Sequence, residues 1–149
     1  LLPVRRDEGT LDEQEITGWI GHAWRKCAET KHVTGGDIHI GFMLAHAPVD
    51  ADGAWPHVAV RNVIERLNNE VIDRHIQMEL YNSRGVTSRG ILDGGKQERE
   101  LAEKYKAMSN MVRARWPRTG ALLRSIARHY EALAKHEDID SDLRDLRWD

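Results

Sequence analysis

A single cysteine, Cys27, is the clearest scarcity in this sequence, and it excludes an internal disulfide bond. The first residues do not resemble a signal peptide, so we expect a reducing, cytoplasmic location. No apolar run approaches the roughly 20 residues that a membrane-spanning helix needs, so we expect no association with a membrane. The chain starts at Leu1 rather than at methionine, which predicts that it is part of a longer protein.

Complete catalytic motifs are a second absence. The sequence contains no HExxH, no GxSxG and no Walker-type phosphate-binding motif. Two pairs of potential metal ligands share a helix face by their spacing, His39 with His46 and His75 with Glu79. Neither pair is a complete ligand set, and Cys27 falls on an apolar stripe, where a buried and inert thiol is expected. We therefore predict no catalytic residue, no metal site and no cofactor.

Length and composition predict one globular domain over residues 1–149. A chain of this length can bury a single core without disulfides or a metal ion. Hydrophobic residues make up 40% and charged residues 31%, a polar balance typical of helical proteins with solvated faces. We expect N-terminal helices over 1–80, a loop over 81–95, and a helical hairpin with a tail over 96–149.

Hydrophobic periodicity predicts an all-α fold. Strand-like alternation is absent, and apolar residues recur at intervals of three and four along several segments. Thr10 and Glu13 have capping-box spacing, so a first helix should begin there and run to about Glu29. A short second helix should span Ile38 to Ala47, after a break at Gly35 and Gly36. The longest predicted helix starts at Pro56 and continues to Leu80.

The C-terminal part should form two antiparallel helices. The first should begin at Asp93 or Gly94 and end near Trp116, because Pro117 prevents smooth continuation. The second should cover 119–133, and a short terminal helix that frays should follow over 139–148. The expected architecture is a bundle of about five helices built from antiparallel hairpins.

The segment from Asn82 to Gly95 is a candidate binding surface, which we call the Gly/Arg loop. It is longer than the roughly two to eight residues that usually connect packed helices. Its glycines permit close backbone approach, and its polar side chains suit phosphate or carboxylate. The candidate contact residues are Arg84, Thr87, Ser88 and Arg89. Asp93 opposes a bound anion at the next helix start, so a loop that packs on the helices or contacts a protein is the alternative.

Positive charge is concentrated between Lys104 and Tyr130, where no acidic residue occurs. The candidate partner-binding residues in this stretch are Arg113, Arg115, Arg118 and Arg124. From Glu131 onward the balance reverses, and acidic residues dominate. Two explanations remain open. The arginines form a patch that neutralises phosphates, or the acidic terminal segment folds back and pairs with the basic helices.

These patterns favour a non-enzymatic helical scaffold or protein-interaction module, part of a larger protein or assembly. Its expected partner is another protein or an adjoining domain. The alternative is a nucleic-acid or phosphate-ligand binder that uses the Gly/Arg loop and the basic helices. Salt dependence separates the two, because phosphate contacts weaken steeply as salt rises.

Overall fold

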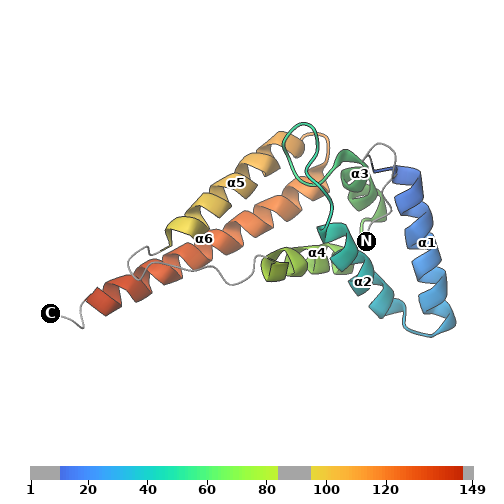
Figure 1. The fold of residues 1–149 in the computed structure, drawn as a ribbon, viewed down its shortest axis with the longest axis horizontal. Coiled ribbons are helices and arrows are strands. Elements are labelled where there is room, and N and C mark those ends of the chain that lie inside the picture. Colours follow the sequence, from blue (N-terminus) through green and yellow to red (C-terminus); the bar gives the residue numbers. More distant parts are fainter. Residues whose placement is uncertain (1–10, 84–94, 146–149) are drawn as a thin grey trace.

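The computed structural model describes residues 11–83 and 95–145, and helices dominate this part of the chain (Figure 1). The all-α prediction is confirmed for these residues. Six helices are present among them: α1 (Glu13–Glu29), α2 (Val33–Ala45), α3 (Val58–Leu67), α4 (Glu70–Ser83), α5 (Lys96–Val112) and α6 (Pro117–Asp145). None of these described helices has the length and apolar character required to cross a membrane.

The first helix has the predicted extent but a different visible cap. Asp12 is the N-cap of α1, and its carboxylate accepts hydrogen bonds from the backbone amides of Gln14 at 2.7 Å and Glu15 at 3.3 Å. Thr10, the predicted capping residue, lies outside the described residues. Ile16 and Ile20 form the buried face of α1, as their spacing predicts.

The second helix begins five residues earlier than predicted, at Val33, and includes the two glycines that were expected to break it. Gly36 lies at a close contact between α2 and α1, where a Cβ atom would be tightly placed at 3.0 Å from Cys27 Sγ. Asp37 lies just before the predicted start at Ile38, where it could have capped the helix; it lies within α2 instead and accepts hydrogen bonds from Trp24 Nε1 at 2.7 Å and Asn69 Nδ2 at 3.0 Å. Packing between helices has overridden the low helix propensity of glycine here.

The predicted helix from Pro56 to Leu80 is two helices, α3 and α4. Asn68 ends α3 in the left-handed conformation with φ 47°. The side-chain oxygen of Asn69 then accepts hydrogen bonds from the amides of Val71 at 2.9 Å and Ile72 at 3.2 Å, which caps α4. Asparagine is tolerated at both positions, because its short polar side chain suits left-handed turns and N-caps.

This break allows α4 to pack closely on α2. At the crossing, a Cβ on Gly41 would lie 2.7 Å from both His75 Cβ and the Ile72 carbonyl oxygen, so only glycine fits. The core lies between these helices and continues to α6. Its largest fully buried apolar side chains are Ile16, Ile20, Ile40, Leu44, Val60, Ile64, Ile72, Ile76, Leu123 and Ile126. Each such side chain contributes roughly 1.5–3 kcal/mol of burial free energy.

A buried arginine holds the segment between α2 and α3. Arg61 is fully buried, and it donates two hydrogen bonds to the Asp52 carboxylate at 2.7 and 2.8 Å. It also donates to the carbonyl oxygens of Pro56 and Ala54, each at 2.6 Å. The hydrogen bonds from Arg61 lower the pKa of Asp52 to about 2.

The start of α6 is attached to α3. The Glu65 carboxylate accepts hydrogen bonds from the amides of Arg118 at 3.1 Å and Thr119 at 2.8 Å. A carboxylate from another helix therefore satisfies the exposed amides at this helix N-terminus. Trp116, just before α6, donates from Nε1 to Asn62 Oδ1 at 2.7 Å.

The acidic C-terminal segment continues α6 as far as Asp145, where the described residues end, and up to that point it does not fold back. A separate terminal helix from residue 139 was predicted, but α6 is continuous from Pro117 to Asp145 and extends away from α1–α4 (Figure 1). No glycine or proline interrupts this segment, so nothing local ends the helix. Within α6, the Asp138 carboxylate accepts hydrogen bonds from the Gly95 amide at 2.9 Å and from the Arg99 guanidinium at 2.5 Å. These two contacts hold the pKa of Asp138 below its usual value.

Candidate functional site

The predicted contact residues of the Gly/Arg loop are not placed by the structure. Arg84, Thr87, Ser88 and Arg89 lie outside the described residues, and their role stays a prediction. The first two positions of the predicted loop, Asn82 and Ser83, belong to α4. Gly95 precedes α5, and its amide donates a hydrogen bond to the Asp138 carboxylate.

Arg118 is placed in an internal contact. Its Nε atom lies 2.7 Å from Asp73 Oδ2, and its guanidinium also donates to Asn68 Oδ1. Burial raises the pKa of Asp73, and the positive charge of Arg118 opposes that shift. Arg118 thus joins α6 to α4 and to the turn before it, and its charge is matched inside the protein.

Arg115 and Trp116 lie together in the turn between α5 and α6. The Arg115 guanidinium carbon is 4.7 Å from the centre of the Trp116 ring, which is a cation–π distance. The same ring has the guanidinium of Arg61 at 5.0 Å. Arg115 is exposed and does not line the pocket described next.

A pocket of about 310 Å³ lies between the end of α5 and the first turns of α6. We call it the arginine pocket. Its polar and charged lining consists of Ser109, Asn110 and Arg113 from the α5 side, and Arg124 and Arg128 from α6. Two of the predicted residues, Arg113 and Arg124, are therefore brought together.

A close helix crossing builds this pocket. A Cβ on Gly120 would lie 2.6 Å from Arg113 Cβ and 2.8 Å from Arg113 Cα, so the glycine lets the two segments meet. The buried Ser109 hydroxyl donates a hydrogen bond to the Gly120 carbonyl oxygen at 2.8 Å and joins α5 to α6. Arg124 follows Gly120 by one helical turn, so these two residues share a face of α6. Both line the pocket together with Arg113.

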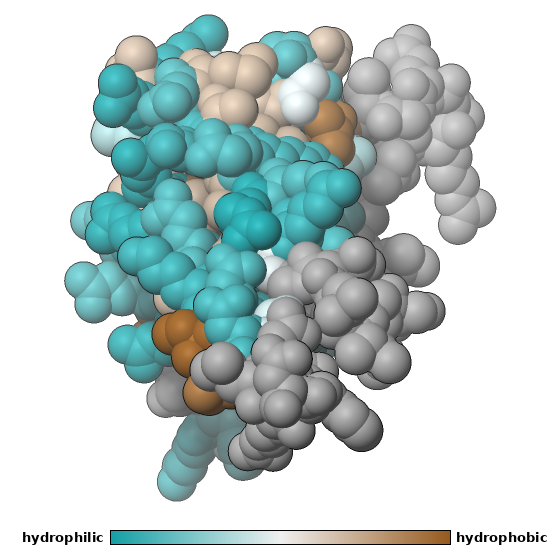
Figure 2. All heavy atoms as spheres, turned by 90° about the vertical axis from the view of Figure 1, so that its left-hand side faces the viewer, coloured by the Kyte–Doolittle hydropathy of each residue, from teal (hydrophilic) through white to brown (hydrophobic). Residues whose placement is uncertain are grey.

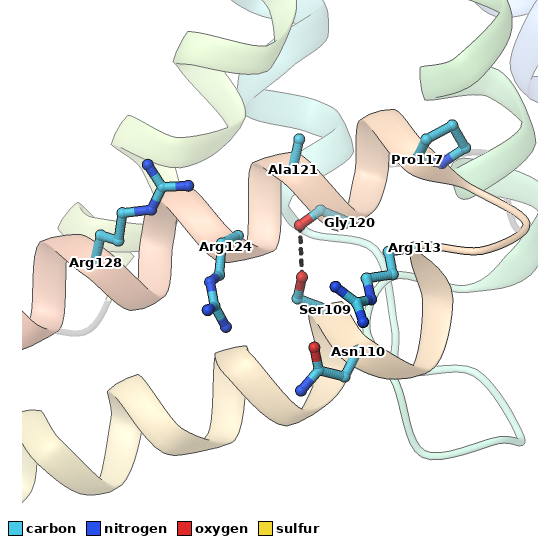
Figure 3. Close-up of a pocket in the computed structure, with 8 residues that line it drawn as sticks. All are labelled: Ser109, Asn110, Arg113, Pro117, Gly120, Ala121, Arg124 and Arg128. Carbon is cyan, nitrogen blue, oxygen red and sulfur yellow. Dashed lines mark hydrogen bonds between the residues drawn. The ribbon is translucent and has the colours of Figure 1, made fainter.

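The arginine side chains differ in direction (Figure 3). Arg124 points from α6 toward α5, and Arg113 turns its guanidinium toward the space above Ser109 and Asn110. Arg128 lies one turn further along α6, and its guanidinium points the other way in this view. Arg113 and Arg124 thus form the centre of the arginine pocket, with Arg128 at its rim.

The charge of the arginine pocket is not matched by the described part of the protein. No ion pair or hydrogen bond links Arg113, Arg124 or Arg128 to a carboxylate among residues 11–83 and 95–145. An anion would therefore gain charge-assisted hydrogen bonds there, each worth roughly 1.5–3 kcal/mol. Chemically, the pocket suits binding of an anion.

Sequence reasoning did not select Ser109, Asn110 or Arg128. The available signal was the spacing of Gly120, Arg124 and Arg128 at four-residue intervals, which places all three on one face of a helix. Nothing in the sequence indicated that α5 would cross this face with Ser109 and Asn110. That proximity depends on the contact between two helices.

The potential metal ligands noted in the sequence make contacts with other protein groups. His46 Nε2 is 3.0 Å from Glu79 Oε1, and His75 bonds the carbonyl oxygen of Val71 through Nδ1 at 2.7 Å. In the described part of the chain, no group of three or more His, Cys, Asp or Glu side chains is arranged to hold a metal ion.

Comparison with known proteins found no matching family model, no matching curated protein and no matching solved structure.

Proposed function

We propose that this protein is a non-enzymatic helical binding module that holds an anionic group of its partner in the arginine pocket. The observation that carries the proposal is the convergence of Arg113 and Arg124, from two helices, on one hollow without a described carboxylate partner. Four other arginines are matched with carboxylates, for example Arg61 with Asp52 and Arg118 with Asp73. Because Arg113 and Arg124 have no carboxylate partner among the described residues, an external anion can form charge-assisted hydrogen bonds with both.

The distribution of exposed hydrophobic residues also favours recognition through charge. The exposed large hydrophobic side chains of the described residues are few: Val49, Met78 and Met111 lie on different segments, and Ile139 and Leu143 lie one turn apart on α6. On the face shown in Figure 2, hydrophilic residues cover most of the coloured surface. Scattered apolar residues are usual on monomeric proteins, so charge is the better basis for recognition.

A titration with sulfate at constant ionic strength tests the proposal. Sulfate should shift the arginine side-chain and Gly120 amide resonances in NMR spectra of the purified chain. Because one charge-assisted hydrogen bond is worth roughly 1.5–3 kcal/mol, Arg113→Gln and Arg124→Gln should each weaken binding by about tenfold or more.

Arg115→Gln is the matched control. It removes the same charge two residues from Arg113, but outside the arginine pocket. Sulfate affinity should then stay within about twofold of the parent protein, because exposed charges at a distance are screened. Equal losses in all three variants would show a general charge effect and would contradict a defined site.

A further inference from the structure

We infer that the arginine pocket takes the dianionic phosphate of a phosphate monoester and not the phosphodiester backbone of a nucleic acid. This inference rests on the proposed anion-binding function and names the ligand class. Three features of the molecule support it: the charge of the pocket, its size, and the contacts that the nearby aromatic rings already make.

The charge of the pocket matches a dianion held at one point. Arg113 and Arg124 supply two guanidinium groups from opposite sides of the hollow, and Asn110 adds an amide on the α5 side. A phosphate monoester carries about −1.5 to −2 charges near neutral pH and has three strong acceptor oxygens. Each phosphodiester carries a single charge, so it would leave one of the two arginines unmatched.

The pocket is also a single hollow, whereas nucleic-acid backbones need a continuous track of cations. Its volume of about 310 Å³ is at the lower end of the roughly 300–1,000 Å³ range of ligand sites. Three other cations of these two helices are paired with carboxylates, whereas Lys104 and Arg128 have no such partner among the described residues. Lys106 lies 3.5 Å from Glu103, Arg99 lies 2.5 Å from Asp138, and Arg118 lies 2.7 Å from Asp73.

The aromatic residues near the pocket are already in contact with protein groups. Trp116 contacts Arg61 and Arg115, and its Nε1 atom is bonded to Asn62. Tyr105 and Tyr130 stack on each other with ring centres 5.9 Å apart. Proteins that bind single-stranded nucleic acid usually offer free aromatic faces to the bases, and these three rings are engaged otherwise.

The pH dependence of binding distinguishes the ligand classes. The second pKa of a phosphate monoester is about 6, so roughly nine-tenths of it is dianionic at pH 7 and one-tenth at pH 5. Phenyl phosphate affinity should therefore fall about tenfold between these pH values. Sulfate remains a dianion over the same range, and its affinity reports any change in the protein itself.

The decisive experiment compares three probes on the full chain at constant ionic strength: phenyl phosphate, sulfate, and an oligothymidylate without terminal phosphates. The expected result is pH-dependent binding of phenyl phosphate, lost in the Arg113→Gln/Arg124→Gln variant and retained in Arg115→Gln. Circular dichroism checks that each variant is folded.

Other outcomes separate the two proposals. If oligothymidylate binds more tightly than phenyl phosphate and without pH dependence, the monoester inference is wrong but anion binding stands. If none of the three probes binds, or if the double variant binds them unchanged, the proposed function is wrong as well.

The source of the monoester is decided by one further comparison. A phosphoserine peptide that binds at least about tenfold more tightly than phenyl phosphate gains contacts beyond the phosphate group, equivalent to about 1.4 kcal/mol. That result assigns the site to a phosphorylated protein. Equal affinity of the peptide and phenyl phosphate assigns it to small phosphorylated molecules.

Discussion

Arg61, beneath the segment between α2 and α3, differs in its hydrogen-bond partners from Arg113 and Arg124 at the junction of α5 and α6. Arg61 is fully buried and donates four hydrogen bonds to a carboxylate and two carbonyl groups. Arg113 and Arg124 line an open hollow and have no described carboxylate partner. The same residue type thus stabilises one region and prepares the other for a ligand, and the neighbouring acceptors decide which role applies.

Removal of Arg61 should have the largest effect on stability. Arg61→Met leaves the carbonyl oxygens of Pro56 and Ala54 buried without their donor, which should cost about 3 kcal/mol of unfolding free energy. Urea denaturation measures the change. Arg25→Met, on the exposed face of α1, is the matched control and should cost less than about 0.5 kcal/mol. A small effect at Arg61 would mean that the segment does not depend on this network.

Closing the crossing at Gly120 should have the next largest effect. Gly120→Ala places a Cβ atom 2.6 Å from Arg113 Cβ, and overpacking of this kind costs about 2 kcal/mol. Gly18→Ala makes the same change in α1, where no atom lies within 4 Å, and should stabilise the protein by roughly 0.5–1 kcal/mol. Thermal denaturation should show a lower midpoint for Gly120→Ala and a higher midpoint for Gly18→Ala than for the parent protein. Two changes of the same sign would contradict the close crossing.

Acid should weaken the Arg61 region. The folded pKa of Asp52 is lowered to about 2 from 3.8, so its contribution to stability is present above pH 3.8 and is lost as the pH falls toward 2. The Asp52 side chain is 40% exposed, and solvent screening reduces the contribution to about 1 kcal/mol. Asp52→Asn should therefore be less stable at pH 5 and should lose less stability than the parent between pH 4 and pH 2. Parallel stability curves would argue against the Asp52–Arg61 pair.

The arginine pocket should show the smallest effect on stability. Arg113→Gln and Arg124→Gln remove charges without a described carboxylate partner, so the unfolding free energy should change by less than about 0.5 kcal/mol. Urea denaturation without added anion measures this. A loss of more than about 1.5 kcal/mol would place these arginines in the structural class with Arg61 and would weaken the binding proposal.

Local patterns predicted the helices well where one helix face is buried. In α1, Ile16 and Ile20 are buried as their spacing predicts, and Pro117 separates α5 from α6. The prediction was wrong at Asn68, where the apolar spacing continues although the helix stops. Periodicity reports which side chains face the core, and two consecutive helices that face the same core preserve it across a break.

The candidate site was predictable only in part for a related reason. Arg113 and Arg124 stood out because the sequence between Lys104 and Tyr130 has no acidic residue. The sequence did not separate them from Arg118, which is paired with Asp73 of α4. Charge along the chain identifies cations, but only the packing of other helices shows which cations already have a partner.

The amino-acid sequence by itself determined the helical class, because apolar spacing and turn residues act over a few positions. Tertiary structure alone decided that Gly120 and Ser109 join α5 to α6, and that the acidic segment extends along α6 instead of covering the arginines. These outcomes depend on contacts between residues distant in sequence or on the direction of a whole helix. For that reason the arginine pocket, and the anion proposed for it, became apparent only in the folded chain.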